Sequence, residues 1–147
     1  MRLSARGEYG VRAMVHLALH YRDGPIPLSR VAEVEGISHH YLEQIFLSLR
    51  RGGLISSVRG VKGGYALSLP PEKVFVGDII RALEGPITPV DCLAGMNSEE
   101  EPSSSCGRSE RCLAKNVWEK LRDNINQFLD NVSLLDMIEC HDPIKIN

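Results

Sequence analysis

Three of the four cysteines, Cys92, Cys106 and Cys112, lie close together in a stretch that is too polar to form a hydrophobic core. Cys106, for example, is flanked by Ser105 and Gly107 rather than by apolar residues. Thiolates are soft ligands that select iron–sulfur clusters, zinc or copper(I). The three cysteines therefore indicate a metal or cluster site, with reversible thiol oxidation or inert cysteines as the alternatives.

The residues around the last of these cysteines favour an ionised thiolate. Ser109 is a suitable cap for a long helix that runs to about Asn131, so we expect Cys112 in the first turn, at the positive end of the helix dipole. Arg108 and Arg111 would offset the charge of an anionic cluster. A structural disulfide is disfavoured in a reducing cytosol.

The composition of the chain indicates a globular protein of one ordinary domain. It has 147 residues, of which 43% are hydrophobic, and no apolar run approaches the roughly 18 residues of a membrane span. The first residues lack the apolar segment and cleavage site of a secretion signal, so we expect a cytoplasmic protein. No nucleophile–base pair, phosphate-binding loop or acid pair stands out, so we do not expect an enzyme.

The charge is distributed unevenly along the chain. Residues 1–70 hold nine Lys/Arg against five Asp/Glu, a net of +4, whereas residues 71–147 hold eight against fourteen, a net of −6. The basic front half is therefore the part that we expect to meet a polyanion.

The front half has the pattern of a winged helix-turn-helix. Apolar periodicity predicts helices over residues 8–21, 29–35 and 39–51, the second capped by Ser29 and the third by Ser38. Two short strands around a glycine-rich turn follow in "GLISSVRGVKGGYALSLP", and "FVGDIIRALEGP" predicts another short helix. The expected fold class is mainly α with a small β-hairpin wing, followed by a long helix.

Several exposed side chains of the 39–51 helix and the wing suit DNA. Gln44 can bond adenine in two places, and Glu43 can accept from a cytosine amino group but would repel phosphate. A salt bridge from Glu43 to Arg50 or Arg51 is the alternative. Cations on a glycine-rich tip suit phosphates or the narrow minor groove of a duplex. The candidate DNA-binding residues are Ser38, His39, His40, Tyr41, Glu43, Gln44, Ser48, Arg51, Arg59, Lys62 and Gly63.

The long helix after the cysteines carries a heptad seam. Its members are spaced 3, 4, 3 and 4 residues apart, long enough for about two heptads. They are Trp118, Leu121, Ile125, Phe128 and Val132. Ser133 and Asp136 resemble a capping box for a last short helix.

The segments "MRLSARGEYGVRAM" and "YLEQIFLSLRRGGLISSVRGVKGGY", together with the cysteine trio, resemble the Rrf family of bacterial winged-helix regulators, and among them its iron–sulfur members. The resemblance spans nearly the whole chain. It implies a cytoplasmic, homodimeric transcription factor that binds a palindromic operator in double-stranded DNA. It also implies that the dimer forms through the long helix, which here carries the heptad seam.

The resemblance further implies an iron–sulfur cluster whose state alters DNA binding, with Cys92, Cys106 and Cys112 as ligands. We expect a 2Fe–2S rather than a 4Fe–4S cluster. Some relatives use a histidine three residues past the last cysteine, but Lys115 stands there. Others use an acidic residue near the start of the first helix, donated by the partner subunit, and Glu8 occupies that position.

Some alternatives stay open. Cys140 and His141 are other candidates for the fourth ligand, and three cysteines with one further ligand also suit zinc. A regulator of the same family gated by a protein partner is a second hypothesis, and a small iron–sulfur redox protein is a third. We expect a DNA-binding domain over residues 1–85, a cysteine loop over 86–111, and a dimerisation helix with a C-terminal helix and tail over 112–147.

Overall fold

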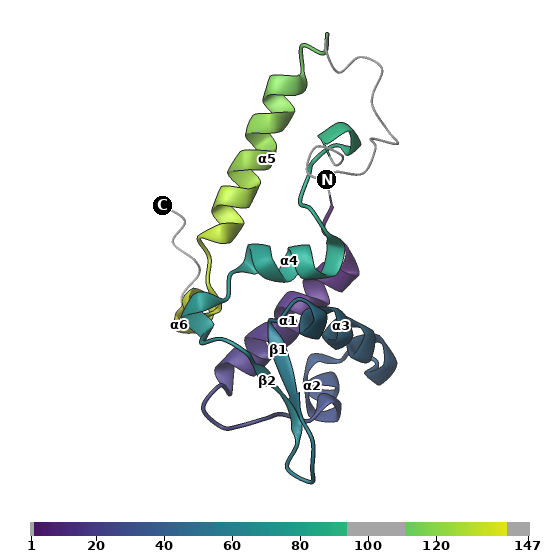
Figure 1. Cartoon of the computed structure of the whole chain (residues 1–147), viewed down its shortest axis with the longest axis vertical. Helices are drawn as coiled ribbons and strands as arrows, with labels where there is room; N and C mark the ends of the chain where they lie inside the picture. Colours follow the sequence, from purple (N-terminus) through teal and green to yellow (C-terminus); the bar gives the residue numbers. More distant parts are fainter. Residues whose placement is uncertain (1, 94–110, 141–147) are drawn as a thin grey trace.

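The structure, a computed structural model, describes residues 2–93 and 111–140, and within them the fold is helical with one two-stranded hairpin (Figure 1). In chain order the elements are α1 (Ala5–Leu19), α2 (Leu28–Glu35), α3 (His39–Arg51), β1 (Ile55–Val58), β2 (Gly64–Leu67), the 3₁₀ turn η1 (Pro71–Lys73), α4 (Val76–Glu84), α5 (Lys115–Asp130) and α6 (Leu134–Glu139). The predicted fold class, a winged helix-turn-helix with a long helix after it, is confirmed.

The hydrophobic core lies between α1, the helix-turn-helix, the base of the hairpin, α4 and the start of α6. The apolar stripe predicted for α3 is fully buried, and it consists of Leu42, Ile45, Phe46 and Leu49. Phe46 packs edge-on against Tyr65 of β2, with ring centroids 4.9 Å apart. The core therefore holds the wing against α3 and sets the position of one relative to the other.

Two of the predicted caps are present. Ser38 caps α3 by accepting a hydrogen bond from the amide of Tyr41 at 3.3 Å. Ser133 and Asp136 form the reciprocal capping box of α6, with hydrogen bonds of 3.1 and 2.9 Å. Each cap satisfies amides that the first helical turn leaves without a partner.

Two helix starts in the front half differ from the prediction. α1 begins before the expected range 8–21, because Ser4 caps it. The prediction that Ser29 caps α2 was wrong, since α2 begins at Leu28 and Ser29 lies inside its first turn. The residue at the cap position is Pro27, whose extended backbone and fixed φ lead into the helix without a side-chain cap.

The start of α5 also differs. The helix begins at Lys115 after Ala114, which provides no side-chain cap, and Ser109 lies outside the described residues. Cys112 thus precedes the helix by three residues, and the carbonyl of Cys112 accepts from the amide of Lys115 at 3.2 Å in the turn before it. The prediction that Cys112 lies in the first helical turn was wrong, because the backbone turns once more before the helix starts.

α5 stands away from the winged domain (Figure 1). α4 lies between the two and contacts α1 and α3 as well as α5. The tip of the hairpin and the start of α5 are at opposite ends of the long axis of the molecule. No helix among the described residues is long and apolar enough to cross a membrane.

Candidate functional site

The outward face of α3 carries most of the predicted DNA-binding side chains. His39, His40, Glu43, Gln44 and Arg51 are all exposed, opposite the buried stripe. Glu43 makes no ion pair within the described part of the chain. Arg50, one of its two expected partners, instead donates a hydrogen bond of 3.2 Å to the hydroxyl of Ser57 on β1. The carboxylate of Glu43 is therefore available to a partner outside the protein.

Three other predicted contact residues have structural roles of their own. The hydroxyl of Ser38 caps α3. Tyr41 is half-buried and packs edge-on against Tyr9 of α1, with ring centroids 5.9 Å apart. The hydroxyl of Ser48 accepts a hydrogen bond from the guanidinium of Arg6 on α1. Tyr41 and Ser48 therefore hold α3 against α1, a role that the sequence pattern did not reveal, whereas the cap at Ser38 was predicted.

The tip of the hairpin presents two cations. Arg59 and Lys62 are exposed, and neither forms a salt bridge to any described residue. Gly63 is half-buried, and a Cβ at this position would lie 2.2 Å from the carbonyl oxygen of Val58. Glycine is required there by the tight turn, so Gly63 shapes the tip that carries the two cations.

The base of the hairpin is fixed to the segment that precedes α2. Tyr65 and Ile26 exchange two backbone hydrogen bonds, of 2.8 and 2.9 Å. A Cβ on Gly64 would lie 2.3 Å from the backbone of Ile26, so the two segments touch directly. The wing is thus attached both to α3, through Phe46 and Tyr65, and to the start of the helix-turn-helix.

The cysteines that the structure describes are free and exposed. Cys92 and Cys112 lie on the two segments that flank residues 94–110, and Cys106 falls outside the described residues. Glu8 is exposed in the first turn of α1. No three His, Cys, Asp or Glu residues among those described come together as a metal site in one protomer.

The fit of these residues to a cluster therefore rests on donor chemistry. Cys92 and Cys112 supply two unbonded, exposed thiols, and Glu8 supplies an exposed carboxylate. Cys140, also free and exposed, stands at the C-cap of α6. His141, the other alternative ligand, lies outside the described residues.

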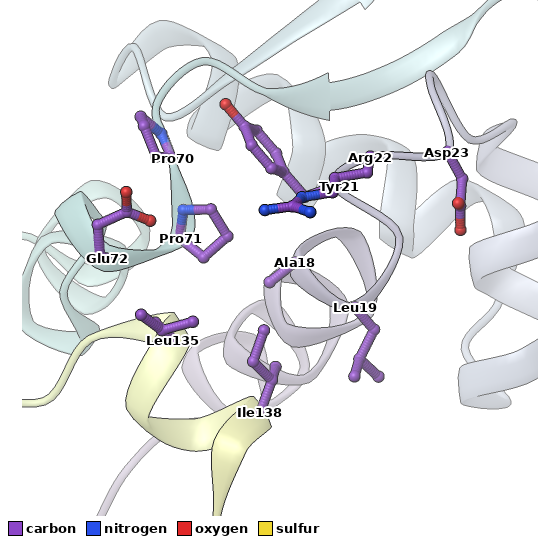
Figure 2. A pocket seen from close by; sticks show the side chains of 10 residues that line it. All are labelled: Ala18, Leu19, Tyr21, Arg22, Asp23, Pro70, Pro71, Glu72, Leu135 and Ile138. Atoms are coloured by element: carbon purple, nitrogen blue, oxygen red, sulfur yellow. The ribbon is translucent and has the colours of Figure 1, made fainter.

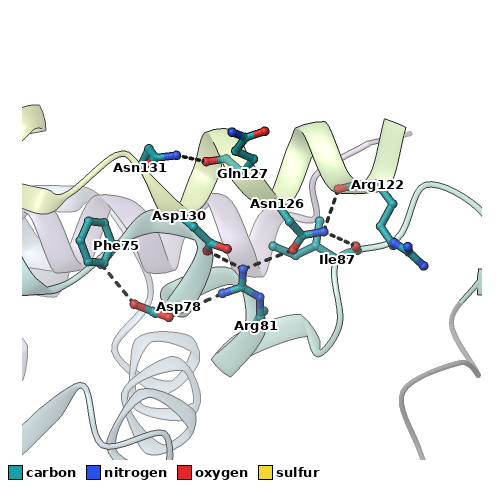
Figure 3. A network of polar contacts seen from close by, with 9 residues as sticks. All are labelled: Phe75, Asp78, Arg81, Ile87, Arg122, Asn126, Gln127, Asp130 and Asn131. Atoms are coloured by element: carbon teal, nitrogen blue, oxygen red, sulfur yellow. Dashed lines mark hydrogen bonds and ion pairs between the residues drawn. The ribbon is translucent and has the colours of Figure 1, made fainter. Parts of the chain in front are cut away.

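A polar network joins the first cysteine segment to α5 and α4 (Figure 3). The guanidinium of Arg81 on α4 lies 2.5 Å from Asp130 and 3.2 Å from the side-chain oxygen of Asn126, both on α5. It also pairs with Asp78 at 3.5 Å. The amide of Asn126 donates to the carbonyl of Ile87 at 3.1 Å. The segment before Cys92 is thus tied to α5, and α5 to α4.

Sequence reasoning missed this network, although a signal was present. Arg81 interrupts the apolar "VGDIIRALE", and Asn126 and Asp130 are four residues apart, hence neighbours on one helix face. The apolar seam of α5 by itself does not indicate this polar face.

The predicted seam on α5 is uncovered. No residue of α5 is buried, and Phe128 is 52% exposed. Leu121 is also exposed, while Trp118 and Ile125 are half-buried. Val132, the last member of the seam, lies beyond the helix, and its carbonyl accepts from the amide of Val76 at 2.9 Å.

A groove of about 590 Å³ lies elsewhere on the molecule, between the end of α1, η1 and α6 (Figure 2). Its lining combines apolar side chains such as Leu135 and Ile138 with the charged Arg22 and Glu72. None of the predicted DNA-binding or ligand residues lines it, so it is separate from both candidate sites.

Comparison with known proteins decides the family. Residues 3–140 match the model of the Rrf2 family, which is described as an iron-dependent transcriptional regulator. The chain belongs to the Rrf2 family. The Rrf2 chain is 37% identical over 146 residues to the HTH-type transcriptional regulator IscR of Yersinia enterocolitica, a match that covers 99% of this chain and 84% of that one.

Two solved structures show the same relationship. IscR of T. potens is 37% identical with a TM-score of 0.75, and the match covers 100% of this chain and 93% of that one. CymR, the global cysteine regulator of B. subtilis, is 37% identical with a TM-score of 0.76, covering 97% and 99%. This Rrf2 protein is therefore a DNA-binding, winged-helix transcriptional regulator and not an enzyme.

Proposed function

We propose that this Rrf2 protein is a homodimer whose operator binding is gated by a 2Fe–2S cluster, held by Cys92, Cys106 and Cys112 with Glu8 of the partner subunit as the fourth ligand. The observation that carries the proposal is the placement of the two described cysteines. Both are exposed, free thiols, and the segment that leads to Cys92 is bonded to α5 through Ile87 and Asn126.

The proposed ligand set, three thiolates and one carboxylate, suits a cluster that reacts readily or is readily lost. Three thiolates and one carboxylate leave one iron with a harder, weaker ligand, and the bound cluster would supply a centre sensitive to iron supply, oxygen or nitric oxide. Arg111, exposed beside Cys112, would offset the negative charge of the thiolates.

The dimer is supported by the open seam on α5. A helix with an apolar heptad stripe and no buried side chain needs a second surface to cover it, and a second copy of the same seam is self-complementary. A two-fold dimer presents two copies of α3 related by symmetry, which requires a palindromic operator with a fixed half-site spacing.

The proposed contacts with DNA are supported by two exposed polar surfaces, the outward face of α3 and the tip of the hairpin. α3 would enter the major groove, where Glu43 and Gln44 meet base edges. Arg59 and Lys62 on the wing would bind phosphates or the minor groove. Because the core holds the wing against α3, both contacts would form in one orientation of the protein on DNA.

The gating is supported by the network around Arg81. A shift of the segment before Cys92 would act on Asn126 through Ile87, and α5 would act on α4 through Arg81. α4 contacts α3, so the tilt of the reading helix would change relative to the dimer axis. Half-sites tolerate little change in separation, which makes a small tilt sufficient to alter affinity.

The experiment compares serine variants of the cysteines after purification without oxygen. Cys92→Ser, Cys106→Ser and Cys112→Ser should each lose iron, acid-labile sulfide and visible absorbance, and the affinity for an operator obtained by selection should become insensitive to reconstitution with iron and sulfide. Cys140→Ser, which removes another exposed thiol, should behave as the wild type. A wild-type protein that stays colourless and iron-free after anaerobic reconstitution would contradict the cluster.

A second candidate is a regulator of the same family gated by a protein partner, by thiol oxidation or by zinc. The identity to CymR, a cysteine regulator, is the same 37% as the identity to IscR, which supports keeping a second signal for this fold. If it holds, the protein will lack iron, and its DNA affinity will respond to a bound partner, to oxidant or to a zinc chelator.

A further inference from the structure

One large apolar side chain on α3 is not part of the core. Leu47 is 39% exposed, whereas the four apolar residues of the buried stripe are 0% exposed. Within α3, all of which the structure describes, Leu47 is the one large hydrophobic residue on the exposed side.

Leu47 lies in the middle of the polar face. It is four residues after Glu43, three after Gln44 and four before Arg51, so it neighbours all of them on the helix surface. Any surface that contacts Glu43 and Gln44 together with Arg51 must therefore also cover Leu47.

We propose that Leu47 is a specificity-determining residue that reads the 5-methyl group of a thymine in the major groove. This inference rests on the proposed entry of α3 into that groove. Among the groups that base pairs display there, the thymine methyl is the apolar one, and it is recognised by apolar side chains. The contact between the Leu47 side chain and the methyl group would exclude water from both.

The helix geometry limits where this thymine lies. One helical turn advances about 5.4 Å, and one base pair advances about 3.4 Å along the duplex. Leu47 is one turn beyond Glu43 and Gln44, so its thymine should lie one or two base pairs from the bases that these two residues contact.

The test removes the methyl group without changing base pairing. An operator is selected from randomised duplexes with the cluster-loaded and the cluster-free protein, and each thymine is then replaced by deoxyuridine. We expect one position per half-site at which the replacement weakens binding about fourfold, the effect of uncovering one methyl group. Glu43→Ala and Gln44→Ala each remove one proposed base contact. The operator positions at which these variants lose their base preference are the positions that Glu43 and Gln44 contact.

The protein variants assign the effect to Leu47. Leu47→Ala should bind the thymine and deoxyuridine operators equally, whereas Leu47→Met, which retains an apolar tip, should keep the difference. Leu19→Ala removes a leucine that is 55% exposed at the end of α1 and should leave discrimination unchanged. Thermal unfolding of each variant checks that the fold is retained.

Two results would overturn the inference while the proposed function stands. One is a selected operator that binds equally well with deoxyuridine at every thymine, or that contains no thymine near the Glu43 and Gln44 positions. The other is a thymine preference that survives in Leu47→Ala. Failure of both protein forms to select any sequence would instead contradict the proposed function, and the reading by Leu47 with it.

Discussion

Asn126 of α5 donates a hydrogen bond to the carbonyl of Ile87, five residues before Cys92. The side-chain oxygen of the same residue accepts from Arg81 of α4. One carboxamide thus joins the cysteine segment, the long helix and the winged domain, and it uses its donor and its acceptor for different partners (Figure 3).

This division allows the two connections to be separated. Asn126→Asp keeps an acceptor for Arg81 but loses the donor to Ile87, so it should lower the free energy of unfolding by about 1–3 kcal/mol, the cost of leaving a partly buried carbonyl unpaired. In mobility-shift titrations, the operator affinities of the cluster-loaded and cluster-free forms of this variant should differ less than those of the wild type.

A matched control exists at the C-cap of the same helix. Asn131 donates to the carbonyl of Gln127 at 2.7 Å but does not reach the cysteine segment. Asn131→Asp should therefore leave the difference in operator affinity between the cluster-loaded and cluster-free proteins intact. If Asn126→Asp retained that difference as well, the coupling would not run through Ile87.

The open face of α5 predicts the effect of charge on assembly. Phe128→Glu places a carboxylate within the apolar seam. In a two-fold dimer formed through the seam, the charge would be buried near the same charge of the partner subunit, so sedimentation should show monomers. Gln127→Glu adds the same charge at the adjacent, exposed position and should remain dimeric. A dimeric Phe128→Glu protein would place the interface elsewhere.

The wing predicts a change in salt dependence. Arg59→Ala should weaken operator binding and lower the slope of log affinity against log salt by about 1 for each phosphate contact that is lost. Arg22→Ala, which removes an exposed arginine at the end of α1, should not change the slope. An unchanged slope in Arg59→Ala would mean that the wing does not meet the backbone of the duplex.

The close approach of the wing to the loop before α2 predicts a steric effect. Gly64→Ala would bring a Cβ within 2.3 Å of the backbone of Ile26. Relief of the clash requires the two segments to separate, so the free energy of unfolding should fall by about 1–3 kcal/mol in denaturant titrations. If Gly64→Ala loses more binding free energy for the operator than free energy of unfolding, the attachment of the wing to Ile26 also positions the hairpin tip on DNA.

The winged helix-turn-helix could be predicted from the sequence because its signals are local. The apolar spacing of α3, the cap at Ser38 and the alternation around Tyr65 each concern residues within one element. The prediction placed Ser29 at the N-cap of α2 and missed Pro27. A proline at this position acts through its backbone conformation rather than through a side-chain hydrogen bond.

The candidate site was less predictable, because its parts meet across long separations. Arg81 and Asp130 are 49 residues apart, and no periodicity links them. Likewise, the clustering of three soft thiolate ligands indicated a metal or cluster site but not that Cys112 precedes its helix by a turn. The seam on α5 was visible as a pattern, yet its exposure became apparent only in the folded protomer.

The absence of any buried side chain on α5 has a consequence for regulation in the cell. If the seam is covered only by a second copy, the functional unit forms by mass action, and at low abundance its population grows with the square of the number of chains. A modest rise in synthesis would then produce a steeper rise in occupied operators. The number of copies per cell would act as an input of its own, beside whatever signal the cysteines receive.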